Sequence, residues 1–329
     1  MRIAIDAMGG DHAPRAQVDS ALAAAAEWPD TQLILVGKPE AIQPLLGANP
    51  PSNISIEPAD EVIESDDEPV RAVRRKQNSS MVVAGRMVKE GRADAMISAG
   101  NTGALMAVGL LLLGRLNGID RPALAPMFPS SDNVGVLALD MGANMDAKPE
   151  HLLQYALMGT IYRAKVHGMN KPRVGLLNVG TEQAKGNELT KAAFDLLNEA
   201  PIHFVGNIEA RDVLNRACDV IVCDGFSGNI MLKAFEGAAS SIFSLLREEL
   251  TSSWKTKLAA AILRPSFRRV RSRMDYNEYN GAPLLGVNGL VVKGHGSSDA
   301  KAMKTAIRHT RTAIGNGLIA ALTEEFSGK

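Results

Sequence analysis

Short apolar runs alternate with amphipathic helical patterns along this chain, and each run has the length of a β-strand. The runs include RIAID, QLILVG, VGVLALDMG and DVIVCDG, and helical patterns stand between them, as at 14–27, 69–90, 149–167 and 184–199. Strands that alternate with helices pack as a mainly parallel sheet with helices on both faces. Strands covered on both faces are apolar throughout. The sequence therefore predicts a three-layer α/β/α fold built on a mainly parallel sheet.

No linker, internal repeat or change in composition divides the 329 residues. A chain of this length can bury one large core. We predict a single α/β/α domain over residues 1–329.

Six strand ends run into turns of one kind, which combine glycine with a small hydroxyl or amide residue and an acid or base. Ligands of doubly wound sheets bind beyond the carboxyl ends of the strands, so we expect these turns to converge on one cleft. Glycine-rich turns that lead into helices present free N–H groups, which favour phosphate or a carboxylate. The six turns are DAMGGDH (6–12), SAGNTGA (98–104), DMGAN (140–144), NVGTEQAKG (178–186), DGFSGN (224–229) and KGHGSSD (293–299).

Two histidines and a lysine, His12, His295 and Lys185, lie inside these turns. Each is a candidate for anion contact or proton transfer, and each is equally compatible with a solvated turn. Lys185 is the strongest candidate, because a lysine beside a glycine at a helix start can reach an anion already bound by backbone donors.

Charge and motifs exclude several classes of function. The 36 lysines and arginines balance the 36 acids, so nucleic acid is a poor candidate partner. The chain has neither a G-x-G-x-x-G after its first strand nor a G-x-x-x-x-G-K-[ST], and no zinc-binding pattern. We therefore predict no cofactor and no metal, with Mg²⁺ on Asp6, Asp11 or Asp140 as a less favoured alternative.

The chain has no pattern of a secreted or membrane-spanning protein. Cys218 and Cys223 fall on opposite faces of a strand-like run, which disfavours a disulfide, and Cys223 is better explained as a small core residue than as a nucleophile. Met1 is followed by a charged residue and a strand rather than an apolar signal core, which predicts a reduced, cytosolic protein. Residues 95–114 are uncharged, but their Ser-Ala-Gly-Asn-Thr-Gly segment favours a strand, a turn and a buried helix over a membrane span.

Residues 251–281 depart from the alternating pattern, and we expect them to protrude as a basic amphipathic helical segment. Trp254, Leu258 and Ile262 share one helical face, and Pro265 should stop or bend the helix. Two lysines and five arginines, with no acid, lie between Lys255 and Arg273.

Eight segments resemble, in order from Ile3 to Ala313, the signature blocks of bacterial phosphate acyltransferases, which make acyl-phosphate from acyl-acyl-carrier protein for phospholipid synthesis. The resemblance implies a homodimer with a fold related to phosphotransacetylases and to isocitrate and isopropylmalate dehydrogenases. It also implies reversible attack of inorganic phosphate on the thioester, with the product passing to a membrane glycerol-3-phosphate acyltransferase. The location implied is the cytoplasm, peripherally at the inner face of the membrane. The segments are DAMGGDHAP, SAGNTGALMA, LDMGAN, LLNVGTEQAKGNE, VGNIEARD, CDVIVCDGFSGN, GAPLLGVNG and KGHGSSDAKA.

Turn chemistry and the resemblance together assign roles to residues. The proposed phosphate ligands are Ser98, Asn101, Thr102, Gly103 and Lys185. The proposed catalytic residues are Lys185, Asn229, His295 and Asp224. The proposed supporting residues are Asp6, Gly9, Gly10, His12, Asp140 and Asn144. Methionines 81, 87, 96 and 106 are adaptable linings for an acyl chain, but core packing explains them better.

Several alternatives remain open. A phosphotransacetylase-like enzyme would use acyl-coenzyme A, and a non-catalytic protein would bind an acyl or phosphorylated ligand without turnover. The basic segment has three interpretations: contact with an anionic membrane, with the acidic carrier protein, or with the dimer mate. The residues concerned are Trp254, Leu258, Ile262, Arg264, Arg268 and Arg269.

Overall fold

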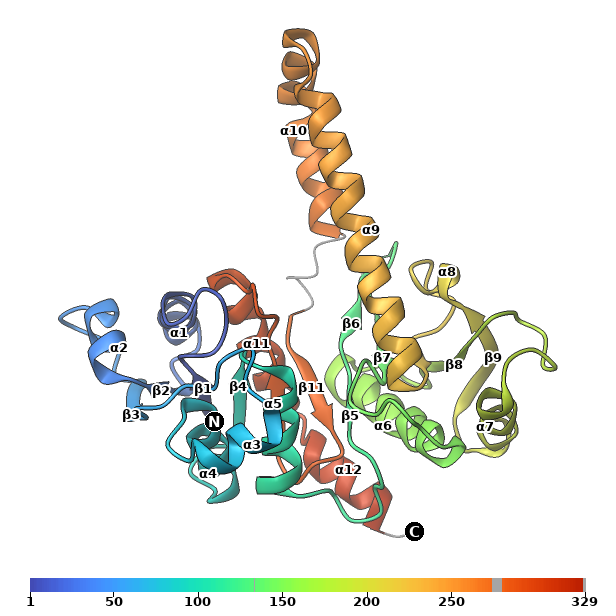
Figure 1. Ribbon diagram of the computed structural model, residues 1–329, viewed down its shortest axis with the longest axis horizontal. Helices are drawn as coiled ribbons and strands as arrows, with labels where there is room; N and C mark the ends of the chain where they lie inside the picture. The colour runs from blue at the N-terminus through green and yellow to red at the C-terminus, as the bar shows by residue number, and fades with distance from the viewer. Residues whose placement is uncertain (133, 274–279, 328–329) are drawn as a thin grey trace.

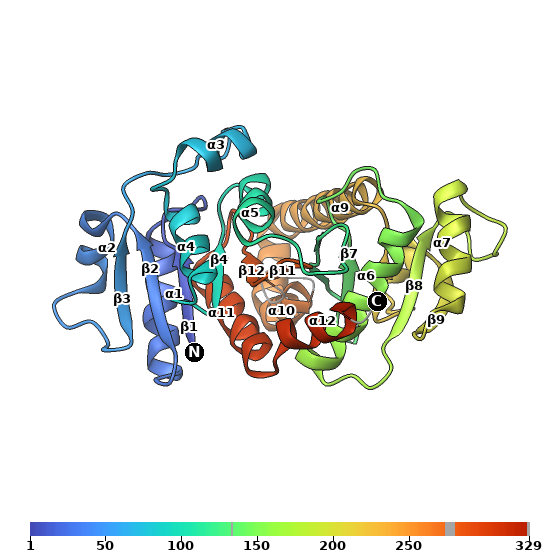
Figure 2. The ribbon, with the colours of Figure 1, turned by 90° about the horizontal axis from the view of Figure 1, so that it is seen from below.

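The computed structural model describes residues 1–132, 134–273 and 280–327. Its strands form two sheets, of seven and five strands, that lie side by side (Figure 2). We call the half that contains the seven-stranded sheet the first lobe and the other half the second lobe.

The seven-stranded sheet of the first lobe is parallel over its first five strands, and its last two strands run antiparallel to their neighbours. Its order is β3 (Ile54–Pro58), β2 (Gln32–Gly37), β1 (Arg2–Asp6), β4 (Ala95–Ser98), β12 (Leu290–Lys293), β11 (Ala282–Leu285) and β5 (Ala123–Leu124).

Helices cover both faces of this sheet (Figure 2). Ile3 and Ile5 of β1 pack into the core beneath α1 and α11, whereas Ala4 packs on the opposite face with α4 and α5. This alternation along a strand buried on both sides produces three layers. The helices of this lobe are α1 (Arg15–Glu27), α2 (Pro39–Leu46), α3 (Pro69–Arg75), α4 (Ser80–Lys89), α5 (Thr102–Val108), the π-helix η1 (Gly109–Leu113) and α11 (Ala300–Gly315).

The five-stranded sheet of the second lobe has four parallel strands and one antiparallel edge strand. Its order is β6 (Met127–Phe128), β7 (Val136–Leu139), β10 (Val220–Val222), β8 (Arg173–Asn178) and β9 (His203–Glu209). The core on one face includes residues of α6 (Pro149–His167) and α7 (Glu188–Glu199), and the core on the other includes residues of α8 (Ala210–Val213) and α9 (Gly225–Thr251). The C-terminal helix α12 (Leu318–Ser327) packs against α6.

The α/β class and the mainly parallel pairing predicted from the sequence are confirmed. The sequence suggested one sheet, whereas the strands divide into two. The sheets separate at antiparallel strands: β11 and β5 are the last two strands of the first sheet, β6 is the edge strand of the second, and all three lie near the middle of the molecule (Figure 1). One buried apolar cluster contains residues of both lobes, such as Leu35 and Leu176. Whether the lobes act as one domain stays a prediction.

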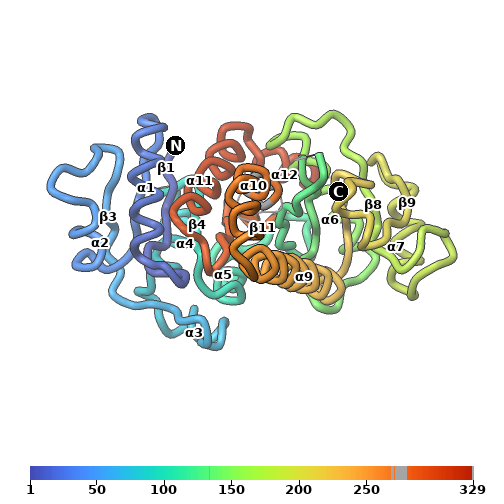
Figure 3. The backbone as a smooth tube through the Cα atoms, turned by 90° about the horizontal axis from the view of Figure 1, so that it is seen from above, coloured from blue at the N-terminus to red at the C-terminus, as the bar shows by residue number. Residues whose placement is uncertain are grey.

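Two long helices project from the two lobes as a hairpin (Figure 1). They are α9 and α10 (Trp254–Arg273), and a view along the hairpin shows the lobes on either side of it (Figure 3). The protrusion therefore begins within α9, earlier than residue 251. Helix α10 continues through Pro265 instead of stopping there.

Trp254, Leu258 and Ile262 of α10 are exposed, by 72, 59 and 73%. Arg264 is exposed as well, whereas the side chains of Arg268 and Arg269 lie outside the described part of the chain. The apolar stripe predicted for this helix is thus on its surface.

The uncharged stretch 95–114 folds as β4, a turn, α5 and η1, as the sequence predicted. Within the described ranges, no helix has the length and apolar character needed to span a bilayer.

Candidate active site

A cavity of about 390 Å³ lies between the two lobes, and we call it the interlobe cavity. Four of the six predicted turns contribute to its lining. Thr102 and Gly103 come from the first lobe, as does the segment 293–296, whereas Gly142 and Asn229 come from the second. The predicted convergence therefore holds for four turns from two sheets, whereas the turns at 6–12 and 178–186 do not line this cavity.

Four ionisable residues line the interlobe cavity. Lys293 ends β12 and His295 follows it, whereas Lys233 and Glu236 stand on α9. Lys233 Nζ lies 2.7 Å from Glu236 Oε2, and His295 Nε2 lies 3.9 Å from Glu236 Oε1. Three basic side chains therefore line the cavity with a single carboxylate, which suits it to an anionic ligand.

Lys293 stands at the carboxyl end of β12, in register with Ser98 of β4. Its ammonium group donates hydrogen bonds to the carbonyl oxygens of Ala99, at 3.4 Å, and of Gly294. Burial lowers the pKa of Lys293 to about 8, against the opposing effect of Asp6 and Asp11. Burial without a carboxylate in contact leaves this charge poorly compensated, so an anion in the cavity would stabilise it.

The backbone around His295 orients its ring. His295 Nδ1 accepts a hydrogen bond from the Ser297 backbone N–H at 3.3 Å, which places the proton of the neutral ring on Nε2, toward Glu236. Burial lowers the pKa of His295, and the nearby Glu236 opposes this shift. Asn280 Oδ1 accepts from the His295 backbone N–H at 2.9 Å.

The interlobe cavity also has an apolar part to its lining. The apolar side chains are Met106, Leu124, Pro126, Met141 and Leu232. The remaining methionines considered as acyl-chain linings, at positions 81, 87 and 96, are buried in the core. The apolar lining suits a hydrocarbon chain.

A second cavity, of about 480 Å³, adjoins the first, and we call it the glycine cavity. It is lined by the β1 turn with Gly10, by the segment 62–65 and by the β4 turn with Asn101. Both cavities share the lining residues Thr102, Gly103, Lys293 and Gly296.

Asp6, Ser98 and Gly9 form the floor of the first-lobe turns. The Ser98 hydroxyl donates to Asp6 Oδ2 at 2.5 Å and accepts from the Gly100 N–H at 3.1 Å. Burial raises the pKa of Asp6, although hydrogen bonds to its carboxylate oppose the shift. A Cβ at position 9 would lie 2.5 Å from Asp6 Oδ2, so this close approach requires glycine. These contacts hold the turns together.

Asp140 and Asn144 hold the turn after β7. Asp140 accepts hydrogen bonds from the backbone N–H groups of Leu124, Ala143 and Asn144 at 3.0, 3.1 and 2.6 Å. Burial raises its pKa to about 6 against these bonds. The Asn144 amide also donates to the Pro122 carbonyl at 2.7 Å, which ties the turn to the segment before β5.

Two further predicted residues cap helices. Asp224 caps α9 by accepting from the Ser227 N–H at 2.8 Å, and Asn101 caps α5 by accepting from the Ala104 N–H at 3.0 Å. The Asn101 amide also donates to three carbonyl oxygens of segment 64–67. Cys223, just before Asp224, is buried, and burial raises the pKa of its thiol.

Lys185 and His12 line neither of the two cavities. Lys185 is exposed in the loop between β8 and α7, where its carbonyl oxygen accepts from Asn178 Nδ2 at 3.2 Å. His12 is exposed after the β1 turn. The described residues contain no group of three or more metal-ligating side chains placed to hold an ion.

Lys233, Glu236, Asn280 and Lys293 line the interlobe cavity but were not among the residues predicted from the sequence. The first two had a readable signal, because Asn229, Lys233 and Glu236 are spaced i, i+4 and i+7 on α9 and so share one face. Lys293 is the first residue of the KGHGSSD turn. Because it also ends an apolar strand, the sequence did not single it out as a site residue.

Comparisons with known proteins identify the family. The family model described as "Fatty acid synthesis protein" matches residues 1–321. A phosphate acyltransferase from Brevibacillus brevis is 62% identical over 307 residues, covering 93% of this chain and 92% of that protein. One from Geobacillus thermodenitrificans is 57% identical, covering 99% of both chains.

The chain belongs to the phosphate acyltransferase family. This confirms the resemblance seen in the sequence, and the family is one of enzymes. Its fold is that of a phosphotransacetylase from Streptococcus pyogenes, with a TM-score of 0.60 at 17% identity and coverage of 95% of this chain and 94% of that one. A branched-chain phosphotransacylase from Enterococcus faecalis gives a TM-score of 0.57 at 12% identity, covering 95% and 99%.

Proposed function

We propose that this enzyme transfers a long-chain acyl group reversibly from acyl carrier protein to inorganic phosphate, giving acyl-phosphate and free carrier protein. The observation that carries the proposal is the interlobe cavity, whose lining combines basic side chains with apolar ones. Phosphate and a hydrocarbon chain need these opposite environments at a short separation. Family membership supports the same reaction.

The chemistry needs positioning and charge stabilisation rather than a protein nucleophile. A phosphate oxygen attacks the thioester carbonyl carbon, the new C–O bond forms and the C–S bond breaks. The proton of hydrogen phosphate ends on the leaving sulfur, so atoms and charge balance without a redox partner. Holding both reactants in one cavity lowers the entropic part of the barrier.

Lys293 and Lys233 are the proposed cations for phosphate, with the Thr102 hydroxyl as a further donor beside them. Two ammonium groups offset the charge of a phosphate dianion during its approach to the carbonyl. Asn229, which enters the cavity from α9, is the proposed donor to the developing oxyanion.

His295 is the proposed proton carrier between phosphate and the leaving sulfur. Its lowered pKa keeps the ring neutral near pH 7, and a neutral imidazole can accept and return a proton. Asp6, Asp140 and Asp224 support the site through backbone contacts. Lys185 keeps its proposed role in phosphate binding and catalysis, from outside the two cavities.

We further propose that the enzyme is a cytoplasmic homodimer that meets the inner face of the membrane through the α9–α10 hairpin and delivers acyl-phosphate to a glycerol-3-phosphate acyltransferase there. The support is the exposed stripe of Trp254, Leu258 and Ile262 on a helix rich in lysine and arginine. Such a helix suits the interface of an anionic bilayer.

Acyl-phosphate formation tests the reaction. Acyl-carrier protein and phosphate are incubated with the enzyme, the product is trapped with hydroxylamine, and acyl-coenzyme A is run in parallel. We expect turnover with the carrier protein and loss of rate in Lys185→Ala. Turnover with coenzyme A alone would assign a phosphotransacetylase, and binding without turnover would assign a non-catalytic protein.

Vesicle sedimentation tests the membrane contact. Leu258→Glu should abolish binding to anionic vesicles and leave soluble acyl transfer largely intact. Leu111→Glu is the control, because Leu111 is similarly exposed, by 51%, on the first lobe. Retained vesicle binding in Leu258→Glu would contradict the proposal.

A further inference from the structure

The glycine cavity is a second chamber that shares Lys293 with the interlobe cavity. Its outer wall is the segment 62–65, which lies far in sequence from the turns that it faces. The Asn101 amide donates to the carbonyl oxygens of Glu64 and Ser65 at 3.3 and 3.2 Å, and Lys76 Nζ donates to that of Val62 at 2.9 Å. Two side chains therefore hold this wall in place, so the chamber is built into the fold.

The two cavities meet at a wall of Thr102, Gly103, Gly296 and Lys293. The first three are small, so little side-chain bulk separates the chambers. A ligand that lies across this wall would have its middle beside Lys293 and one end in each cavity.

The charges of the two chambers differ. The interlobe cavity is lined by Lys233, Lys293, His295 and one acid, Glu236, whereas the glycine cavity is lined by Asp11 and Glu64 together with Lys293. Two carboxylates oppose the entry of a phosphate dianion. Carboxylates, the Ser65 hydroxyl and turn carbonyls instead accept hydrogen bonds from amide N–H groups.

A thioester extends in two directions from its carbonyl, with the acyl chain on one side and the thiol-bearing arm on the other. The apolar side chains of the interlobe cavity suit the acyl chain. The second direction needs a channel of its own, because the proposed reaction already places the acyl chain and phosphate in the interlobe cavity of about 390 Å³.

We propose that the glycine cavity binds the thiol-side arm of the thioester, a neutral chain carrying secondary amides, while the reacting carbonyl lies at the wall shared with the interlobe cavity. This inference rests on the proposed function. It separates the arm from phosphate, so that both substrates bind at once and phosphate attacks from the Lys233 side.

Ser65→Trp tests the assignment, because Ser65 is exposed at the cavity wall and a larger side chain there narrows the chamber without disturbing the core. Ser52→Trp is the matched control, since Ser52 is also exposed and lines neither cavity. The probes are dodecanoyl-pantetheine, which carries the amide-containing arm, and the S-ethyl thioester of the same acid, which has no arm.

We expect Ser65→Trp to raise the KM for dodecanoyl-pantetheine about tenfold, equivalent to about 1.4 kcal/mol. The KM values for the S-ethyl thioester and for phosphate should stay within about twofold of wild type, as all values should in Ser52→Trp. An equal loss with both thioesters, or a raised KM for phosphate, would overturn the inference.

Calorimetry with pantetheine alone separates this inference from the proposed reaction. Pantetheine should bind wild type and Ser52→Trp but not Ser65→Trp, whether or not the enzyme forms acyl-phosphate. Equal binding to all three would overturn the assignment even if acyl transfer is confirmed.

Discussion

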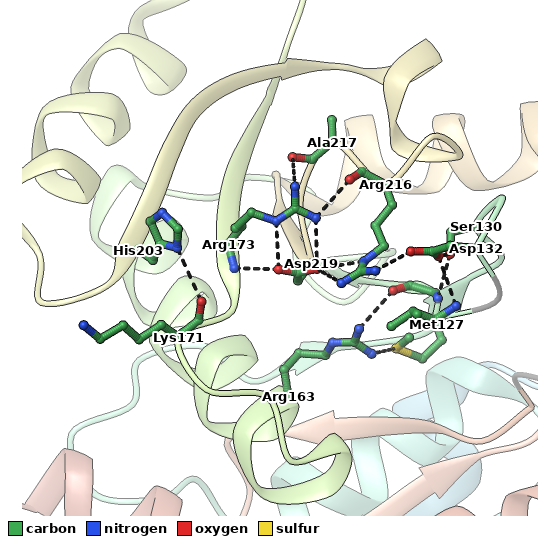
Figure 4. A network of polar contacts seen from close by, with 12 residues as sticks. Met127, Ser130, Asp132, Arg163, Lys171, Arg173, His203, Arg216, Ala217 and Asp219 are labelled. Atoms are coloured by element: carbon green, nitrogen blue, oxygen red, sulfur yellow. Dashed lines mark hydrogen bonds and ion pairs between the residues drawn. The ribbon is translucent and has the colours of Figure 1, made fainter.

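Cations are gathered in two regions of the molecule, and the acids around them differ. In the second lobe, Arg173 and Arg216 surround Asp219, and Arg216 also pairs with Asp132 (Figure 4). In the interlobe cavity, Lys233 and His295 share Glu236, and Lys293 has no ion pair among the described residues. The first region is a closed set of ion pairs, and the second has cationic capacity left for a ligand.

The ion pairs of Figure 4 join β8, which begins at Arg173, to the segment before β10, which contains Arg216 and Asp219. Arg173 donates to Asp219 from its backbone N–H at 2.8 Å and from Nε at 3.1 Å, and Arg216 Nε donates at 2.9 Å. Burial alone would raise the pKa of Asp219, but these hydrogen bonds lower it to about 2. Buried Arg163 donates to the Gly135 carbonyl at 3.0 Å in the same region.

Lys293 shows the opposite balance. Its pKa is lowered rather than raised, because burial outweighs the attraction of Asp6 and Asp11. Carboxylate partners, rather than burial, therefore distinguish a cation that stabilises the fold from one that is available to bind a ligand. An arginine already paired with carboxylates stabilises the chain, whereas a desolvated lysine facing a cavity is a candidate for an anionic substrate.

We expect the strongest effect from replacing Lys293 in the interlobe cavity, which should lower acyl transfer. Lys293→Met should lower the rate of acyl-phosphate formation about 10²-fold, the scale for loss of one preorganised group that stabilises transition-state charge. Its stability in urea should not fall, since a buried charge is removed. Lys89→Met, at the exposed end of α4, is the control and should keep full activity. Unfolding of Lys293→Met would show that the lysine serves the fold.

The second prediction concerns the free energy of unfolding when the ion pairs of Asp219 are broken. Asp219→Asn should lower the free energy of unfolding by about 2 kcal/mol, because two arginines lose their charged acceptor. Acyl transfer per folded molecule should be unchanged. A wild-type stability curve against pH provides a second check: the contribution of Asp219 is present above about pH 4 and is lost as the pH falls toward 2.

A third prediction concerns pH. With its pKa near 8, Lys293 is charged below pH 8 and loses its proton above it, so the KM for phosphate should rise about tenfold per pH unit on the alkaline side. Lys293→Arg should remove this rise, because a guanidinium stays charged. A profile that is flat between pH 7 and 9.5 in wild type would refute the assignment.

The weakest effect is expected when Glu236, the carboxylate that lines the interlobe cavity, is made neutral. Glu236→Gln should lower the KM for phosphate about threefold, because Lys233 loses a competing partner of modest strength. Initial rates across a phosphate series measure it. A raised KM would mean that Glu236 positions Lys233 rather than competes for it.

Much of the fold could be predicted because its signals are local. Apolar runs and the glycine turns after them identified the strands and brought Thr102, Gly103, Asn229 and His295 into the site. The division into two sheets could not be predicted, since it depends on which strands pair, and β5 and β6 have two residues each.

The site residues that the sequence did not indicate come together only through tertiary structure. Lys293 reaches the site because β12 inserts beside β4, which no local pattern reveals. The Asn101 turn was predicted from its sequence to bind phosphate, which stays a prediction, and the structure adds that its amide holds the segment 64–67.

The most direct test of the account is the phosphate dependence of acyl-phosphate formation, measured side by side for wild type, Lys293→Met and Asp219→Asn at saturating thioester. The account predicts that the KM for phosphate rises in Lys293→Met and stays at the wild-type value in Asp219→Asn. An unchanged KM in Lys293→Met, or an equal rise in both variants, would contradict it.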